Sequence, residues 1–69
     1  MFRLTAEREK KGWSQSELGR RTGINPATIS RLEAGKIYAY SGYRRRLGQA
    51  LGVPGDKLFE EVPADERKE

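Results

Sequence analysis

The side chains of residues 26–34 (PATISRLEA) include a set suited to reading the surface of another molecule. At about 100° per residue of helix, Ile29, Leu32 and Glu33 gather on one side. The opposite side carries Ala27, Ser30, Arg31 and Ala34, with Thr28 on the flank. An arginine guanidinium matches guanine O6 and N7, or a phosphate, and a small methyl group fits against that of thymine. This face therefore fits a DNA major groove, although a solvated face of small residues explains the segment equally well.

The sequence contains none of the usual catalytic or metal-binding clusters. It has no histidine, the commonest general base and metal ligand, and no cysteine, so disulfides and thiolate chemistry are excluded. Asp56, Glu60 and Glu61 are neighbouring carboxylates, but on a helix their spacing is that of ordinary surface charge. No glycine-rich phosphate loop is present. We therefore expect no enzyme, no metal and no cofactor, and the lack of cysteine fits a reducing cytoplasm.

The charges are divided unevenly along the 69 residues, a length that suits one small domain. Residues 1–50 hold eleven Lys and Arg against four Asp and Glu, whereas residues 51–69 hold three against six. The basic body favours an anionic partner, most often nucleic acid, with solubility as the alternative explanation. There is no apolar run of about 18 residues and no apolar stretch at the N-terminus, so we expect neither a membrane span nor a signal peptide.

Start and stop signals frame the segment that carries the polar face. Asn25 is a good N-cap, and Pro26 then falls at the first helical position, where a missing amide hydrogen does no harm. Ile24 and Ile29 are spaced as a hydrophobic staple around this cap. Gly35 is expected to end the helix in the left-handed conformation. The sequence predicts a short helix of about nine residues with a defined orientation.

The preceding helix begins with the same kind of signals. Ser14 and Glu17 have the spacing of a capping box, and Trp13 and Leu18 that of a staple. The helix is expected to end near residue 22, with Gly23 turning the chain. Two capped helices joined by a short glycine turn are thus predicted.

Helical signals continue through the rest of the chain, and strand alternation is absent. We expect further helices over about residues 2–11, 42–51 and 54–61. The prediction is a compact all-α domain of five helices over residues 1–61. Residues 62–69 have little apolar content and are expected to form a flexible acidic and polar C-terminal tail.

Residues 15–32 (QSELGRRTGINPATISRL) resemble the helix-turn-helix of the Cro/phage-repressor (Xre-type) regulator family. The apolar contacts and the turn glycine of that motif fall on Leu18, Gly23, Ile24, Ile29 and Leu32. Flanking segments, among them "EAGK" and "LGQALGV", extend the resemblance over about residues 3–60. Gly19 stands where the family usually has alanine, at a close crossing of two helices. The resemblance implies a repressor-like DNA-binding domain whose second motif helix lies in the major groove.

The resemblance also implies roles for individual residues. Ala27, Thr28 and Arg31 occupy the base-reading positions, and Pro26 stands where a polar reader often stands. Gln15 matches a residue that contacts a phosphate and braces a base reader. The predicted contacts to the DNA backbone are Gln15, Ser30, Lys36, Tyr38, Tyr40, Ser41 and Arg44. Arg8 and Glu33 match an ion pair that joins the first helix to the third.

The stretch "YAYSGYRRR" departs from the family's pattern and has several interpretations. The family usually has apolar residues at Ser41 and Arg44, and also at Glu7. Aromatic residues interleaved with arginines can stack on bases of single strands. Alternatively, Tyr43 covers the core and the three arginines are solvated. A further interpretation has the hydroxyls of this stretch, with an arginine, holding phosphates beside the recognition helix.

Two functions of different classes fit these features. The first is a small, sequence-specific, repressor-like regulator of transcription that binds a palindromic operator as a homodimer. Val53, Leu58 and Phe59 are candidates for its self-contacts, although they suit the core of a monomer equally well. The second is an antitoxin-like or controller-type protein that mainly binds a protein partner while regulating its own gene.

Overall fold

The computed structural model describes residues 1–65, which form four α-helices and one 3-10 helix. They are α1 (Arg3–Lys10), α2 (Gln15–Thr22), α3 (Pro26–Glu33), α4 (Ser41–Leu51) and η1 (Gly55–Phe59). Within these residues there is no β-strand, and the only β-type backbone pairing is one isolated antiparallel bridge. The predicted all-helical class is confirmed, with boundaries within about two residues of those expected for the α-helices.

The prediction of a fifth α-helix is wrong, because residues 55–59 form a 3-10 helix. Its turns close between residues three apart, from Lys57 N to Pro54 O (2.9 Å) and from Glu60 N to Lys57 O (3.2 Å). Glu60 then becomes extended, and its carbonyl accepts a hydrogen bond from Arg3 N (2.9 Å). The segment therefore closes three-residue turns, and the chain leaves the helix at Glu60, where it bonds to Arg3.

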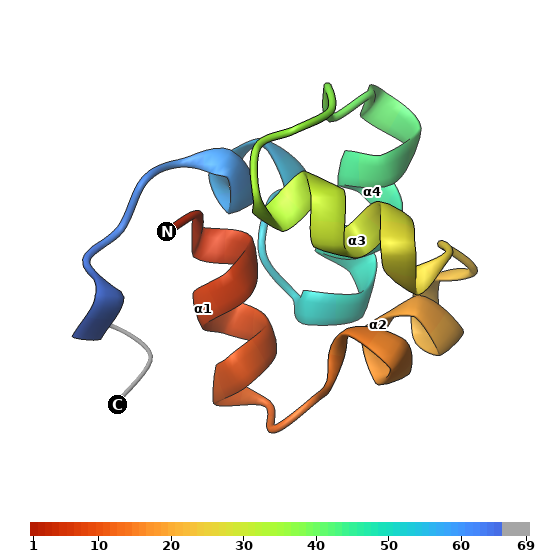
Figure 1. The fold of residues 1–69 in the computed structure, drawn as a ribbon, viewed down its shortest axis with the longest axis horizontal. Coiled ribbons are helices and arrows are strands. Elements are labelled where there is room, and N and C mark those ends of the chain that lie inside the picture. Colours follow the sequence, from red (N-terminus) through yellow and green to blue (C-terminus); the bar gives the residue numbers. More distant parts are fainter. Residues whose placement is uncertain (66–69) are drawn as a thin grey trace.

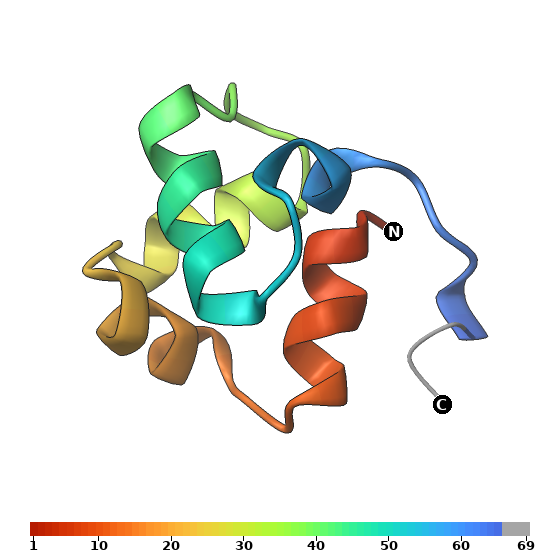
Figure 2. The same cartoon turned by 180° about the vertical axis from the view of Figure 1, so that it is seen from behind.

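Every element contributes to one core. In Figure 1, α3 lies across the front, α1 lies beside it and α2 lies below. In Figure 2, where the molecule is seen from the opposite side, α4 lies at the front. The largest fully buried side chains are Leu4, Leu18, Ile29, Leu32, Leu47 and Leu58. Leu58 has no exposed surface, and the ring of Phe59 packs edge-on against Phe2 at 5.6 Å. Leu58 and Phe59 thus serve the core of the single chain, and Leu58 cannot form the self-contact suggested for it.

The caps of α2 and α3 are formed as predicted. Ser14 Oγ accepts a hydrogen bond from Glu17 N (3.0 Å), and Asn25 Oδ1 accepts one from Ala27 N (2.8 Å). Gly23 turns the chain with φ of 74°, a left-handed value that favours glycine. The Glu17 side chain, however, accepts hydrogen bonds from Arg20 and Arg21 instead of completing the capping box.

A close crossing of α2 and α3 explains why glycine occupies position 19. A Cβ atom there would lie 2.6 Å from the carbonyl oxygen of Ile24 and 3.1 Å from Cγ of Pro26. The first of these neighbours is backbone, which cannot move without shifting the turn. Gly19 therefore lets the Pro26 end of α3 sit directly against α2.

The two ends of the described chain lie side by side. Phe2 and Glu61 form the isolated bridge, and Val62 N donates to Met1 O (2.8 Å). Val62, expected in the tail, is only 7% exposed, so the ordered body extends through this residue. Residues 66–69 of the expected tail lie outside the described residues. No helix within residues 1–65 is long and apolar enough to span a bilayer.

Candidate nucleic-acid interface

The outer face of α3 is bare, as its periodicity predicted. Ile29 and Leu32 are buried, whereas the opposite side is open to solvent. Its exposed residues are Pro26, Ala27, Ser30, Arg31 and Ala34, with Thr28 half-buried. Within residues 1–65 the Arg31 side chain has no hydrogen bond or ion pair. The face therefore offers one unengaged guanidinium between small side chains, on the helix at the front of Figure 1.

Behind this face, three polar side chains from three helices meet. Arg8 of α1 donates from Nε to Glu33 Oε2 (2.7 Å) and from Nη2 to Glu33 Oε1 (3.1 Å). Gln15 of α2 donates from Nε2 to the same Oε1 (3.0 Å). The side chains of Arg8 and Glu33 are only 11% and 8% exposed. The expected ion pair is present, and we call the three residues the Arg8–Glu33–Gln15 network.

The network also fixes the backbone where α2 begins. Arg8 Nη1 donates to the carbonyl oxygen of Trp13 (2.8 Å), the residue before the Ser14 cap. The first amides of any helix lack intrahelical acceptors and attract anions. Gln15 is the first residue of α2, so its own backbone amide is one of these groups. We call this side of α3 the α2 flank.

The other side of α3 is formed by the loop of residues 36–40 and the start of α4, which we call the α4 flank. Lys36 is exposed, and Tyr38 and Tyr40 are each 64% exposed, with their rings edge-on at 4.8 Å. Tyr40 is the N-cap of α4 but makes no side-chain cap hydrogen bond. Ser41 is exposed beside it. The flank thus combines a lysine, hydroxyl groups and an uncapped helix N-terminus.

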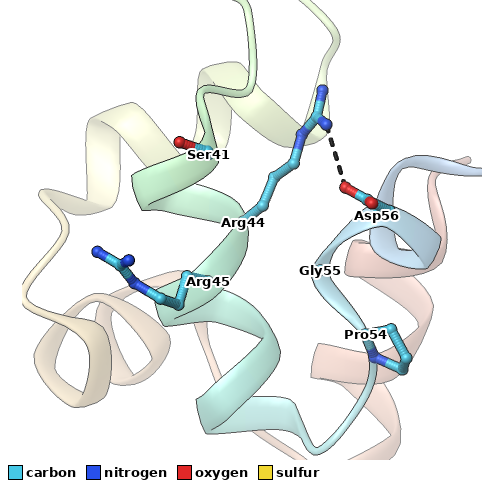
Figure 3. Close-up of a pocket in the computed structure, with 6 residues that line it drawn as sticks. All are labelled: Ser41, Arg44, Arg45, Pro54, Gly55 and Asp56. Carbon is cyan, nitrogen blue, oxygen red and sulfur yellow. Dashed lines mark hydrogen bonds and ion pairs between the residues drawn. The ribbon is translucent and has the colours of Figure 1, made fainter.

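Arg44 points away from Ser41, toward η1 (Figure 3). Its Nη1 donates to Asp56 Oδ1 (3.1 Å), and its guanidinium lies 5.6 Å from the centroid of the Tyr38 ring. Its Nε is buried and has no hydrogen-bond partner among residues 1–65. The guanidinium that was expected to contact DNA is therefore already engaged with a carboxylate.

Arg45 is the residue that sequence reasoning passed over at this flank. It is exposed, has no ion pair within residues 1–65, and lies on the same side of α4 as Ser41 (Figure 3). Helical rotation measured from the buried Leu47 puts Arg44 on the inner side and Arg45 opposite, so the signal was in the sequence. Tyr43 packs partly buried against the core, in agreement with one interpretation of this stretch.

The two arginines of α2 are also engaged. The side-chain hydrogen bond from Arg20 lowers the pKa of Glu17, and Arg21 adds to the effect. Arg21 also lies over the ring of Trp13, 4.2 Å from its centroid. These cations are paired within the domain. Among residues 1–65, Arg31, Lys36 and Arg45 are exposed positive groups on or close after α3 that have no ion pair.

Comparison with known families agrees with this arrangement. The model of a family described as a helix-turn-helix domain matches residues 2–60. The match covers most of the chain, which therefore belongs to this family, in agreement with its resemblance to the Cro/phage-repressor (Xre-type) regulators. No curated protein and no solved structure gave a significant match.

Proposed function

We propose that this member of the helix-turn-helix domain family is a small, sequence-specific transcriptional regulator of the Cro/phage-repressor type that acts in the cytoplasm. Family membership indicates DNA binding with a regulatory role. The observation that carries the finer proposal is the outer face of α3, where exposed small side chains surround one unengaged arginine. A helix with such a face can approach base edges closely in a major groove.

In this proposal Arg31 carries most of the direct polar reading. Pro26 and Ala27 have no side-chain donors or acceptors, so they offer only van der Waals contact, for example with a thymine methyl group. Thr28 is half-buried and can add a hydroxyl from the edge of the face. The preferred base for Arg31 is guanine, whose O6 and N7 match the guanidinium fork.

Phosphates on the two sides of the groove would be held by the two flanks of α3. On the α2 flank the contact is Gln15, and Ser30 adds a hydroxyl from the outer face of α3 itself. On the α4 flank they are Lys36, Tyr38, Tyr40 and Ser41, with Arg44 only when it leaves Asp56. Such contacts position the protein on the duplex and supply the salt-dependent part of the affinity.

A single α3 spans only a few base pairs, so we propose that two copies bind together on a palindromic operator. Two-fold symmetry places the half-sites about 10 base pairs apart, centre to centre. The surface that joins the copies does not include Leu58, which is fully buried.

A second candidate function is the binding of a protein partner by an autoregulating, antitoxin-like chain. The observation that favours it is the exposure of Ile37, Tyr38 and Tyr40 in consecutive parts of one loop, because exposed apolar clusters mark interaction sites. Purification of the tagged chain from its native host distinguishes the roles: a stoichiometric protein partner supports this second function.

Selection of bound duplexes from a random pool, followed by sequencing, tests the main proposal. We expect an enriched palindrome with guanine at the position read by Arg31. Binding of the enriched duplex should weaken linearly on a log–log plot against salt concentration. Equal binding of the enriched and the random duplex would contradict sequence-specific regulation.

A further inference from the structure

Gln15 is held by Glu33, whose side chain is only 8% exposed, and not by any residue of the exposed face of α3. From this contact we infer that Glu33 and Arg8 are positioning residues for the phosphate contact on the α2 flank. The network holds the Gln15 amide in its binding orientation before DNA arrives. The inference rests on the proposed function, since it concerns how one of the proposed contacts is made.

The carboxylate of Glu33 is a fixed acceptor. Two hydrogen bonds from Arg8 hold it, at 2.7 and 3.1 Å, and little of either side chain reaches solvent. Gln15 Nε2 donates one of its two hydrogens to this carboxylate, which leaves the other for an external acceptor. The rotamer freedom of Gln15 is thus lost on folding and not on binding, which favours association.

The positive charge of Arg8 makes an acidic residue acceptable at this place. An unpaired carboxylate bonded to Gln15 would repel a phosphate approaching the same amide. The bidentate guanidinium neutralises Glu33, while Nη1 of Arg8 holds the Trp13 carbonyl at the start of α2. Arg8 therefore sets both the charge beside the contact and the backbone that carries it.

The proline at the start of α3 limits Gln15 to one of the two roles that the resemblance implied. The resemblance implied that Gln15 also braces a polar base reader, but Pro26 occupies that position and has no donor or side-chain acceptor. The amide has no reader to support and is available for the phosphate alone. We infer that Gln15 contributes to affinity for every sequence alike and not to base preference.

The experiment uses the full chain and its selected duplex, in which single phosphates are replaced in turn by neutral methylphosphonates. For the unchanged protein, one replacement facing α2 should weaken binding about tenfold, the size of one charge-assisted hydrogen bond. Gln15→Ala and Glu33→Gln should each weaken binding of the normal duplex by a similar factor. Both variants should be insensitive to that replacement, and the double variant should lose no more than either single variant.

Controls keep structural damage apart from lost positioning. Glu33→Asp retains the charge opposite Arg8 but shortens the reach to Gln15, so it should show the same insensitivity if Glu33→Gln fails to fold. Arg31→Ala should keep the sensitivity to the methylphosphonate, because it changes only base reading. Additive losses in the double variant, or retained sensitivity in Glu33→Asp, would overturn the inference.

A measurement without DNA separates this inference from the proposed function. Relaxation of the Gln15 side-chain NH2 group, measured by NMR on the free protein, should report an ordered amide that becomes mobile in Glu33→Asp. A mobile amide in the unchanged protein would overturn the inference even if DNA is bound. An ordered amide in a protein that binds no duplex would contradict the proposed function and with it the phosphate contact.

Discussion

The two flanks of α3 present polar groups in different ways. On the α2 flank, Gln15 is bonded to a carboxylate that is 8% exposed and that is itself held by Arg8. On the α4 flank, Tyr38 and Tyr40 are largely exposed, the helix has no side-chain cap, and Arg44 pairs with an Asp56 that is 87% exposed. Substitutions on the α2 flank should therefore change folding stability and DNA binding together. Substitutions on the α4 flank should change binding with little effect on stability.

The largest effect is expected for Arg8→Ala. Removing the guanidinium leaves the Glu33 carboxylate, which is only 8% exposed, without its cationic partner, so the free energy of unfolding should fall by about 3 kcal/mol. Urea denaturation followed through the fluorescence of Trp13, the one tryptophan, measures this loss. Arg45→Ala, which removes an exposed arginine with no ion pair within residues 1–65, is the matched control. Equal stability of the two variants would show that the α2 flank is no more important for folding than the α4 flank.

The second effect concerns the face between the two flanks. Arg31→Ala should reduce discrimination at a single base position by about 1–3 kcal/mol, because the guanidinium has no substitute on α3. Lys36→Ala, on the α4 flank, should instead weaken binding to all sequences and reduce the salt slope by about one. Titrations of both variants on the selected and on a random duplex measure the difference. Parallel losses on both duplexes in the Arg31 variant would contradict base reading.

The third effect compares the caps of two helices. Ser14→Ala removes the hydrogen bond to Glu17 N and should destabilise the domain by about 1 kcal/mol. Tyr40→Ala removes no cap hydrogen bond and should leave stability nearly unchanged while weakening duplex binding. Thermal unfolding and duplex titration of both variants test this contrast, and a large stability loss in Tyr40→Ala would show that the α4 flank is also part of the folded framework.

A small effect on stability is also expected for Asp56→Asn. The pair with Arg44 is mostly exposed on the acid side, so its loss should change the free energy of unfolding by less than about 1 kcal/mol. Duplex affinity at low salt should rise, and the salt slope should steepen by about one if Arg44 then takes up a phosphate. Glu60→Gln removes an equal charge that has no ion-pair partner in the described part of the chain, and it serves as the control. Equal gains in both variants would mean that general charge, and not Arg44, is responsible.

The sequence predictions were correct where a feature depends on residues close together in the chain, and wrong where it depends on distant segments. Ser14, Gly23 and Asn25 were assigned correctly because a cap or turn depends on residues within about four positions. The prediction of a helix over 54–61 was wrong because the carbonyl of Glu60 accepts a hydrogen bond from the backbone amide of Arg3, near the other end of the chain. The orientation of Arg44 toward Asp56 likewise depends on how η1 packs against α4.

By itself, the sequence determined the two capped helices, the glycine turn between them and the bare outer face of α3. These features follow from helical periodicity and from hydrogen bonds between near neighbours. The resemblance implied the pair of Arg8 and Glu33, twenty-five residues apart, but only the tertiary structure decided that Gln15 would be held by Glu33, eighteen residues away. The physical reason is that such bonds require three helices to be packed, and packing is set by the shared apolar core and not by any local pattern.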